Sequence, residues 1–223
     1  MCNKQIINTK PSGMKLKAVA DVVFCFDCTL SMDDCIENVK NNANAFVAGL
    51  NAGQGNIIDW RMRAMGYGDL EEGEEVQNDN DFTSSVADFQ AQVNSLKMCH
   101  GGDEPESTLD AIIMAAKTSK WRRAHKIVVV FTDAPTKELH DTTKKTFAIN
   151  NINEMMDSLA NDHIKLFLWG PSDTNYNVLK AVPKSEITEL TDPHTEFKSD
   201  NKMESLLELM GKTVSDVIGS EVL

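Results

Sequence analysis

The sequence predicts an α/β fold, doubly wound and Rossmann-like, with a mostly parallel central sheet and helices on both faces. Apolar runs alternate with amphipathic stretches from about residue 18 onward, which is typical of such folds. Hydrophobic residues at 41% and charged residues at 25% are globular values, and we find no internal repeat or dividing linker. We therefore expect an N-terminal extension over residues 1–17 and a single domain over residues 18–220.

Strands and helices are expected in alternation along the chain. The run 18–26 is almost continuously apolar, which predicts a buried central strand. Residues 57–65 alternate cleanly between apolar and polar side chains, which indicates a sheet edge or a strand with one wet face. The further strands are expected at 126–131, 164–169 and 186–190, and the helices at 32–50, 86–98, from about 105, 145–161, 176–180 and 201–218.

The charge balance excludes some classes of partner. The chain has 22 Lys and Arg against 34 Asp and Glu, a formal net charge of −12. Nucleic acids and anionic membranes need basic surfaces, so neither is expected as a partner. No membrane-spanning run or signal peptide is visible, and five cysteines are an odd number, so we expect a cytoplasmic protein with reduced thiols.

Part of the acidic excess lies in one loop. Residues 69–81 hold seven carboxylates in thirteen positions without a Lys or Arg, which predicts a solvated loop or an electrostatic collar around a nearby site. A Gly-rich acidic loop follows at residues 101–107. The first loop lacks the spacing and the turn glycine of a calcium-binding loop.

Two strand ends carry the candidate chemistry, because ligands of open parallel sheets bind beyond the carboxyl ends of the strands. Alternate side chains of extended chain point the same way, so the oxygens of Asp27, Thr29 and Ser31 can converge. Asp133 follows the most hydrophobic strand. Hard oxygen ligands suit Mg²⁺, Mn²⁺ or Ca²⁺ rather than zinc. Alternatively, Thr29 or Ser31 merely caps the next helix.

The segment Asp27-Cys28-Thr29-Leu30-Ser31-Met32 resembles the Asp-x-Ser/Thr-x-Ser signature of von Willebrand factor type A domains, which forms their metal-ion-dependent adhesion site. Further matches keep the order of that family, and the two loops Asp-Cys-Thr-x-Ser-Met and Gly-Gly-Asp-x-Pro-Glu look most like the intracellular branch beside alpha-kinases and the hemicentin-type domains. The other matching segments are residues 66–69, 81–84, 101–106 and 129–134.

The resemblance implies a divalent cation bound by Asp27, Thr29, Ser31, Asp133 and one residue of the second loop. Family members often have a threonine there. Counting back along the chain puts Glu106 at that position, and counting forward puts Asp103 there, so both stay candidates. An acidic ligand would neutralise more of the metal charge than a hydroxyl, and would weaken its attraction for a carboxylate donated by a protein partner.

The function expected from these features is a non-catalytic, cation-dependent protein interaction module. A metal-dependent hydrolase of the same topology and a metal-free scaffold remain the alternatives. Phosphatases with a related strand-end motif need Asp-x-Asp, and position 29 is Thr, so the acid/base carboxylate is missing. Cys25 and Cys28 have the Cys-x-x-Cys spacing but begin inside a strand, so we expect them to be buried apolar groups. The sequence leaves the oligomeric state open.

Overall fold

The computed structural model describes residues 18–52, 58–99 and 104–219. The described strands form one five-stranded sheet in the order β2-β1-β3-β4-β5, and all neighbouring pairs are parallel. The expected fold class is confirmed, and so is the edge position of the alternating strand. The strands are β1 (Ala18–Asp27), β2 (Ile58–Tyr67), β3 (His125–Phe131), β4 (Ile164–Gly170) and β5 (Glu186–Glu189).

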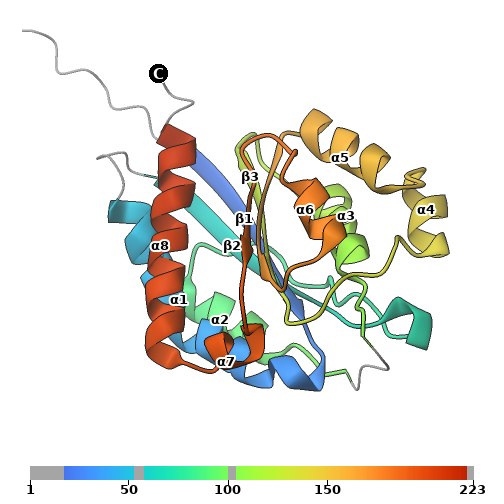
Figure 1. The fold of residues 1–223 in the computed structure, drawn as a ribbon. Coiled ribbons are helices and arrows are strands. Elements are labelled where there is room, and N and C mark those ends of the chain that lie inside the picture. The colour runs from blue at the N-terminus through green and yellow to red at the C-terminus, as the bar shows by residue number, and fades with distance from the viewer. Residues whose placement is uncertain (1–17, 53–57, 100–103, 220–223) are drawn as a thin grey trace, which may run out of the picture.

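Helices cover both faces of this sheet. In Figure 1, α1, α2, α7 and α8 lie on one side and α3 to α6 on the other. Each layer closes its own apolar core, one beneath α1 and α8 and one beneath α3 and α5. The helices are α1 (Asp33–Ala52), α2 (Val86–Asn94), α3 (Thr108–Thr118), α4 (Asp141–Phe147), α5 (Ile152–Asn161), α6 (Thr174–Leu179), α7 (Pro193–Phe197) and α8 (Asp200–Gly219), with 3₁₀ turns η1 (Leu30–Met32) and η2 (Leu70–Glu72).

Strand β1 is central because both of its faces are apolar. Val22 and Phe24 belong to the core under α1 and α8, whereas Val23 and Cys25 belong to the core on the other side. The run that ends at Asp27 is thus held by neighbours on both faces and both edges. Cys25 and Cys28 are fully buried and free, as expected of small apolar groups.

Helices α1 and α8 lie side by side on one face of the sheet (Figure 1). Two glycines make the close approach possible. A Cβ on Gly49 would lie 2.1 Å from the carbonyl oxygen of Glu208, and one on Gly211 would lie 2.2 Å from that of Phe46. This contact fixes α1, whose N-terminal end directly follows the loop after β1.

Two sequence expectations about helices are wrong. The expected helix over 145–161 is two helices, because Ala148 adopts a left-handed φ of 54° after α4 and Asn151 then caps α5. The helix expected from residue 105 begins at Thr108, with Ser107 as its N-cap residue, so Pro105 lies in the preceding loop. Within the described part of the chain, no helix is long and apolar enough to cross a membrane.

Candidate metal centre

The carboxyl ends of β1 and β3 lie next to each other in the middle of the sheet. Phe26 pairs with Phe131, so Asp27 and Thr132 follow at neighbouring positions. From β1 the chain leads to β2 on one side, and from β3 it leads to β4 on the other. This is the switch point at which open parallel sheets bind ligands.

Asp27 is fully buried at this point, and hydrogen bonds hold both of its oxygens. Oδ1 accepts from the backbone nitrogen of Thr29 at 3.0 Å and from its hydroxyl at 2.7 Å, and Oδ2 accepts from the hydroxyl of Thr132 at 2.9 Å. Burial raises the pKa of Asp27 to about 6, and the charge of Asp133 adds to the rise. The site therefore concentrates negative charge where water is excluded.

The hydroxyls of Thr29 and Ser31 lie between the buried carboxylate of Asp27 and solvent. They lie 3.2 Å apart and share a hydrogen bond. Thr29 is buried, whereas Ser31 is exposed. Thr29 occupies the N-cap position of η1 without a side-chain capping bond, so its hydroxyl serves Asp27 rather than the helix end. This finding disfavours a pure capping role for Thr29.

Glu106 is buried near the same charges. Its Oε2 has no hydrogen-bond partner, and its backbone pairs with Thr136 in the loop after β3. Burial raises the pKa of Glu106 to about 8, and the charges of Asp27, Asp69 and Glu74 contribute. A buried carboxylate oxygen without a partner is costly unless a cation or donor completes it. The other second-loop candidate, Asp103, lies outside the described residues.

Asp133 stands just after β3, with a side chain that is 9% exposed. Its Oδ2 lies 3.9 Å from Nδ1 of His194, which α7 carries. The charge of Asp133 also raises the pKa of Asp27, so the two carboxylates are close enough to repel each other. Strand ends β1 and β3 thus each bring an aspartate to this edge.

The acidic loop after β2 is only partly solvated, so the expectation of a fully solvated loop is wrong. Asp69 is fully buried, and its Oδ2 accepts a hydrogen bond from Nζ of Lys137 at 2.6 Å. The same ammonium group lies 3.1 Å from Oε2 of Glu71. Lys137 therefore neutralises one buried carboxylate beside the site, and its charge also lowers the pKa of Glu106.

The donor set fits a small hard cation in its chemistry. It consists of carboxylate and hydroxyl oxygens, one of which, Oε2 of Glu106, is buried without a partner. Among the described residues, no group of three or more His, Cys, Asp and Glu side chains could hold a metal ion. A cation at this edge would consequently depend on the hydroxyls of Thr29 and Ser31 as well as on carboxylates.

A comparison with protein families identifies the domain type. The model of the von Willebrand factor A domain matches residues 21–165. The chain belongs to this family. The matched region includes both strand ends and the loop with Glu106. A comparison with curated proteins found no match.

Solved structures support the same fold for this von Willebrand factor A domain. Proximal thread matrix protein 1 from the mussel byssus superimposes with a TM-score of 0.52 at 15% sequence identity. The match covers 89% of this chain and 46% of the mussel protein, so the chain spans about half of that structure's length. At this identity the likeness concerns the fold alone.

Sequence reasoning missed three side chains that shape the site. Thr132 bonds Asp27, Lys137 neutralises Asp69, and His194 approaches Asp133. Thr132 was detectable, since it directly precedes Asp133 at a strand end. Lys137 and His194 meet their partners only through the folding of distant segments, so no local pattern indicates them.

Proposed function

We propose that this von Willebrand factor A domain binds a divalent cation, Mg²⁺ or a similar ion, and acts as a non-catalytic protein interaction module. The observation that carries the proposal is the unpartnered Oε2 of buried Glu106, whose pKa the charge of Asp27 helps to raise, together with the hydrogen-bonded oxygens of Asp27, Thr29 and Ser31. A cation would offset the charge that these groups and Asp133 bring together. We also propose that the protein is cytoplasmic and that it is related to the intracellular alpha-kinase-associated and hemicentin-type branch of the family.

An exposed leucine supports the interaction role. Leu30 lies between Thr29 and Ser31, and 58% of its surface is exposed. Among the described residues, Leu209 is the only other large hydrophobic side chain that is exposed. A protein partner that reached the cation, for example with a carboxylate, would also cover Leu30 and gain apolar burial.

Calorimetric titration with Mg²⁺ and Mn²⁺ tests the proposal. The wild type should give binding heats, and an Asp27→Ala/Asp133→Ala variant should not. An Asp157→Ala/Asp216→Ala variant removes two exposed carboxylates from α5 and α8 and should behave as the wild type. Equal heats for all three proteins would contradict a cation at this edge.

The second candidate is a metal-free scaffold, which the hydrogen bonds among Asp27, Thr29, Ser31 and Thr132 favour. In that case the site oxygens satisfy one another and the interaction surface needs no ion. A ligand that binds only the native state must raise its apparent stability. A melting temperature that is the same in Mg²⁺ and in a chelator would therefore favour the scaffold.

A further inference from the structure

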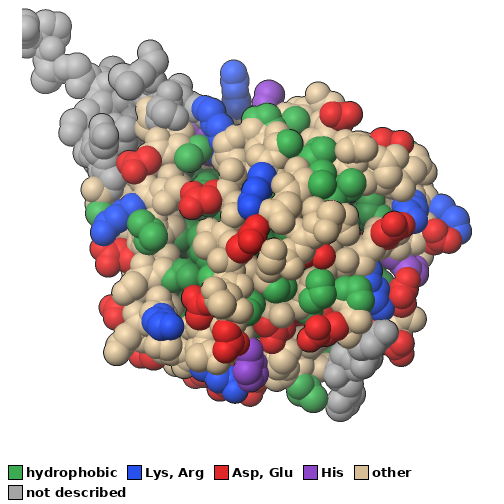
Figure 2. Space-filling model, viewed as in Figure 1, with side chains coloured by type: hydrophobic (Ala, Val, Ile, Leu, Met, Phe, Trp, Pro, Cys, Tyr) green, Lys and Arg blue, Asp and Glu red, His purple; other side chains and the backbone are tan. Residues whose placement is uncertain are grey.

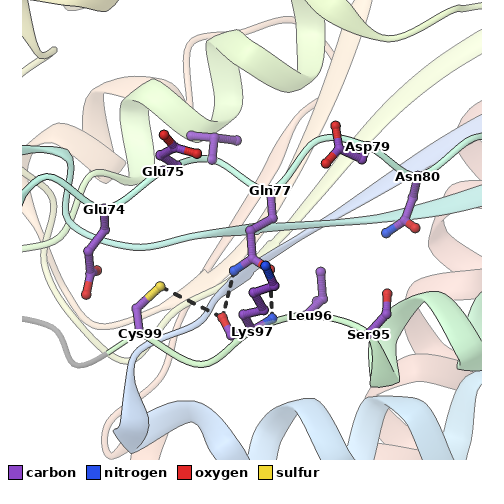
Figure 3. A pocket seen from close by; sticks show the side chains of 10 residues that line it. Glu74, Glu75, Gln77, Asp79, Asn80, Ser95, Leu96, Lys97 and Cys99 are labelled. Carbon is purple, nitrogen blue, oxygen red and sulfur yellow. Dashed lines mark hydrogen bonds between the residues drawn. The ribbon is translucent and has the colours of Figure 1, made fainter.

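A cavity of about 350 Å³ opens beside the candidate metal centre, between the chain after β2 and the chain after α2. Figure 3 shows its lining side chains on these two segments. Residue Cys99 at its end pairs with Thr29, a candidate cation ligand, through a parallel β-bridge. The cavity and the centre are thus neighbours on one edge of the sheet. The lining residues are Glu74, Glu75, Val76, Gln77, Asp79, Asn80, Ser95, Leu96, Lys97 and Cys99.

The walls of the cavity are held in place by hydrogen bonds. The side chain of Gln77 donates from Nε2 to the carbonyl of Lys97 and accepts at Oε1 from its backbone nitrogen, both at 2.7 Å (Figure 3). The backbone of Gln77 also exchanges two hydrogen bonds with Gly66 of β2. Both segments are therefore tied to the sheet and to each other. Such an opening needs little ordering when a ligand enters.

Glu74 is fixed at the end of the cavity nearest the centre. Its Oε2 accepts a hydrogen bond from the backbone nitrogen of Asp69 at 2.8 Å. It packs so closely on Gly68 that a Cβ there would lie 2.1 Å from Oε2. This carboxylate cannot swing far from its place, so it offers a defined negative charge.

The lining combines an apolar body with acidic groups. Val76 and Leu96 supply the apolar surface, and three carboxylates and one lysine, Lys97, also line the cavity. The side chains of Glu75 and Asp79 are exposed, and within the described part of the chain neither carboxylate has an ion-pair partner. The chain has 34 Asp and Glu against 22 Lys and Arg, and Figure 2 shows side chains of both signs spread over the visible face. The cavity suits an apolar stem that ends in a positive charge.

We propose that this cavity receives a lysine or arginine side chain of the protein partner, next to the candidate cation. The inference rests on the proposed function and names the chemistry of its partner. Charge complementarity selects this occupant, because an acidic or purely apolar side chain would leave the carboxylates facing like charge or desolvated. The partner would thus be held by the loops around the centre as well as through the ion.

Protein-observed NMR with two small probes tests this inference. N-acetyl-arginine N-methylamide carries the cationic head, and the matching citrulline compound has nearly the same shape without the charge. At matched ionic strength, the arginine probe should shift the backbone amides of Gln77, Leu96 and Cys99 in a saturable way. The citrulline probe should bind about threefold more weakly, which lies within the range expected for exposed ion pairs. Equal binding of both probes, or shifts elsewhere, would overturn the inference.

Charge variants separate this cavity from a general attraction by an acidic protein. Glu75→Gln/Asp79→Asn should weaken the arginine probe at least about threefold. Asp157→Asn/Glu204→Gln, which removes the same charge at exposed positions on α5 and α8, should leave its affinity unchanged. Equal effects of the two double variants would overturn the inference.

Repeating the NMR titration in Mg²⁺ and in chelator separates the two proposals. If the arginine probe still gives specific shifts but calorimetry detects no heat of metal binding, the cavity inference is supported and the cation proposal is contradicted. Metal heats without arginine-specific shifts would overturn the cavity inference alone.

Discussion

The hydroxyl of Thr132 donates a hydrogen bond to Oδ2 of Asp27 at 2.9 Å, across the boundary between β3 and β1. Both residues are fully buried. The bond joins the two central strands at the point where their side chains stop being apolar. It leaves the carboxylate of Asp27 oriented and partly satisfied even without a cation.

Removing this donor should destabilise the protein. In chelator at pH 8, Thr132→Val is expected to lower the free energy of unfolding by about 1–3 kcal/mol, because a buried carboxylate oxygen loses its partner. Thr132→Ser keeps the hydroxyl and should cost less. Urea denaturation measures both. A valine variant as stable as the wild type would show that the bond does not stabilise Asp27.

The buried carboxylates should make the cation-free protein less stable as pH rises. Burial raises the pKa of Glu106 from 4.5 to about 8, so the folded state keeps a proton that the unfolded state loses. The contribution of Glu106 to the free energy of unfolding is fully present below about pH 4.5 and is lost as the pH rises toward 8. The contribution of Asp27 should be lost in the same way as the pH rises from 3.8 to about 6.

Melting curves in chelator between pH 5 and pH 8.5 test this dependence. Glu106→Gln cannot ionise, so its stability relative to the wild type should improve steadily across this range. Parallel curves for the two proteins would contradict a raised pKa at Glu106.

The ion pair between Lys137 and Asp69 should matter more than exposed pairs. Lys137→Met leaves the fully buried carboxylate of Asp69 without its ammonium partner, which should lower the free energy of unfolding by about 3–5 kcal/mol. Lys120→Met breaks the pair with Asp81, whose side chains are 82% and 81% exposed, and should cost at most about 1 kcal/mol. Chemical denaturation of both variants makes the comparison. Similar small losses would mean that water reaches Asp69.

The strands were predictable because their signal is local. Continuous apolar runs up to Phe26 and Phe131 mark strands with two buried faces, and the alternation around Arg61 marks the edge strand. The break between α4 and α5 was also visible in part. Asn151 accepts hydrogen bonds from the backbone of Asn153 and Glu154, and an Asn followed three positions later by Glu is a helix-start signal.

The candidate site was predictable only in its aspartates and hydroxyls. Asp27, Thr29 and Ser31 lie together as expected, but Ser31 reaches the others through the 3₁₀ turn η1 rather than through extended chain. The burial of Asp69 was not predictable, because its partner Lys137 lies 68 residues further along the chain. His194 reaches Asp133 from α7, a short helix that the periodicity of the sequence does not indicate.

Anomalous scattering from crystals of the protein soaked in Mn²⁺ tests the proposed cation site most directly. We predict a manganese peak within coordinating distance of the hydroxyls of Thr29 and Ser31. The same soak of an Asp27→Asn/Asp133→Asn crystal should show no peak there. A wild-type crystal in saturating Mn²⁺ without a peak at these oxygens would contradict cation binding at this site.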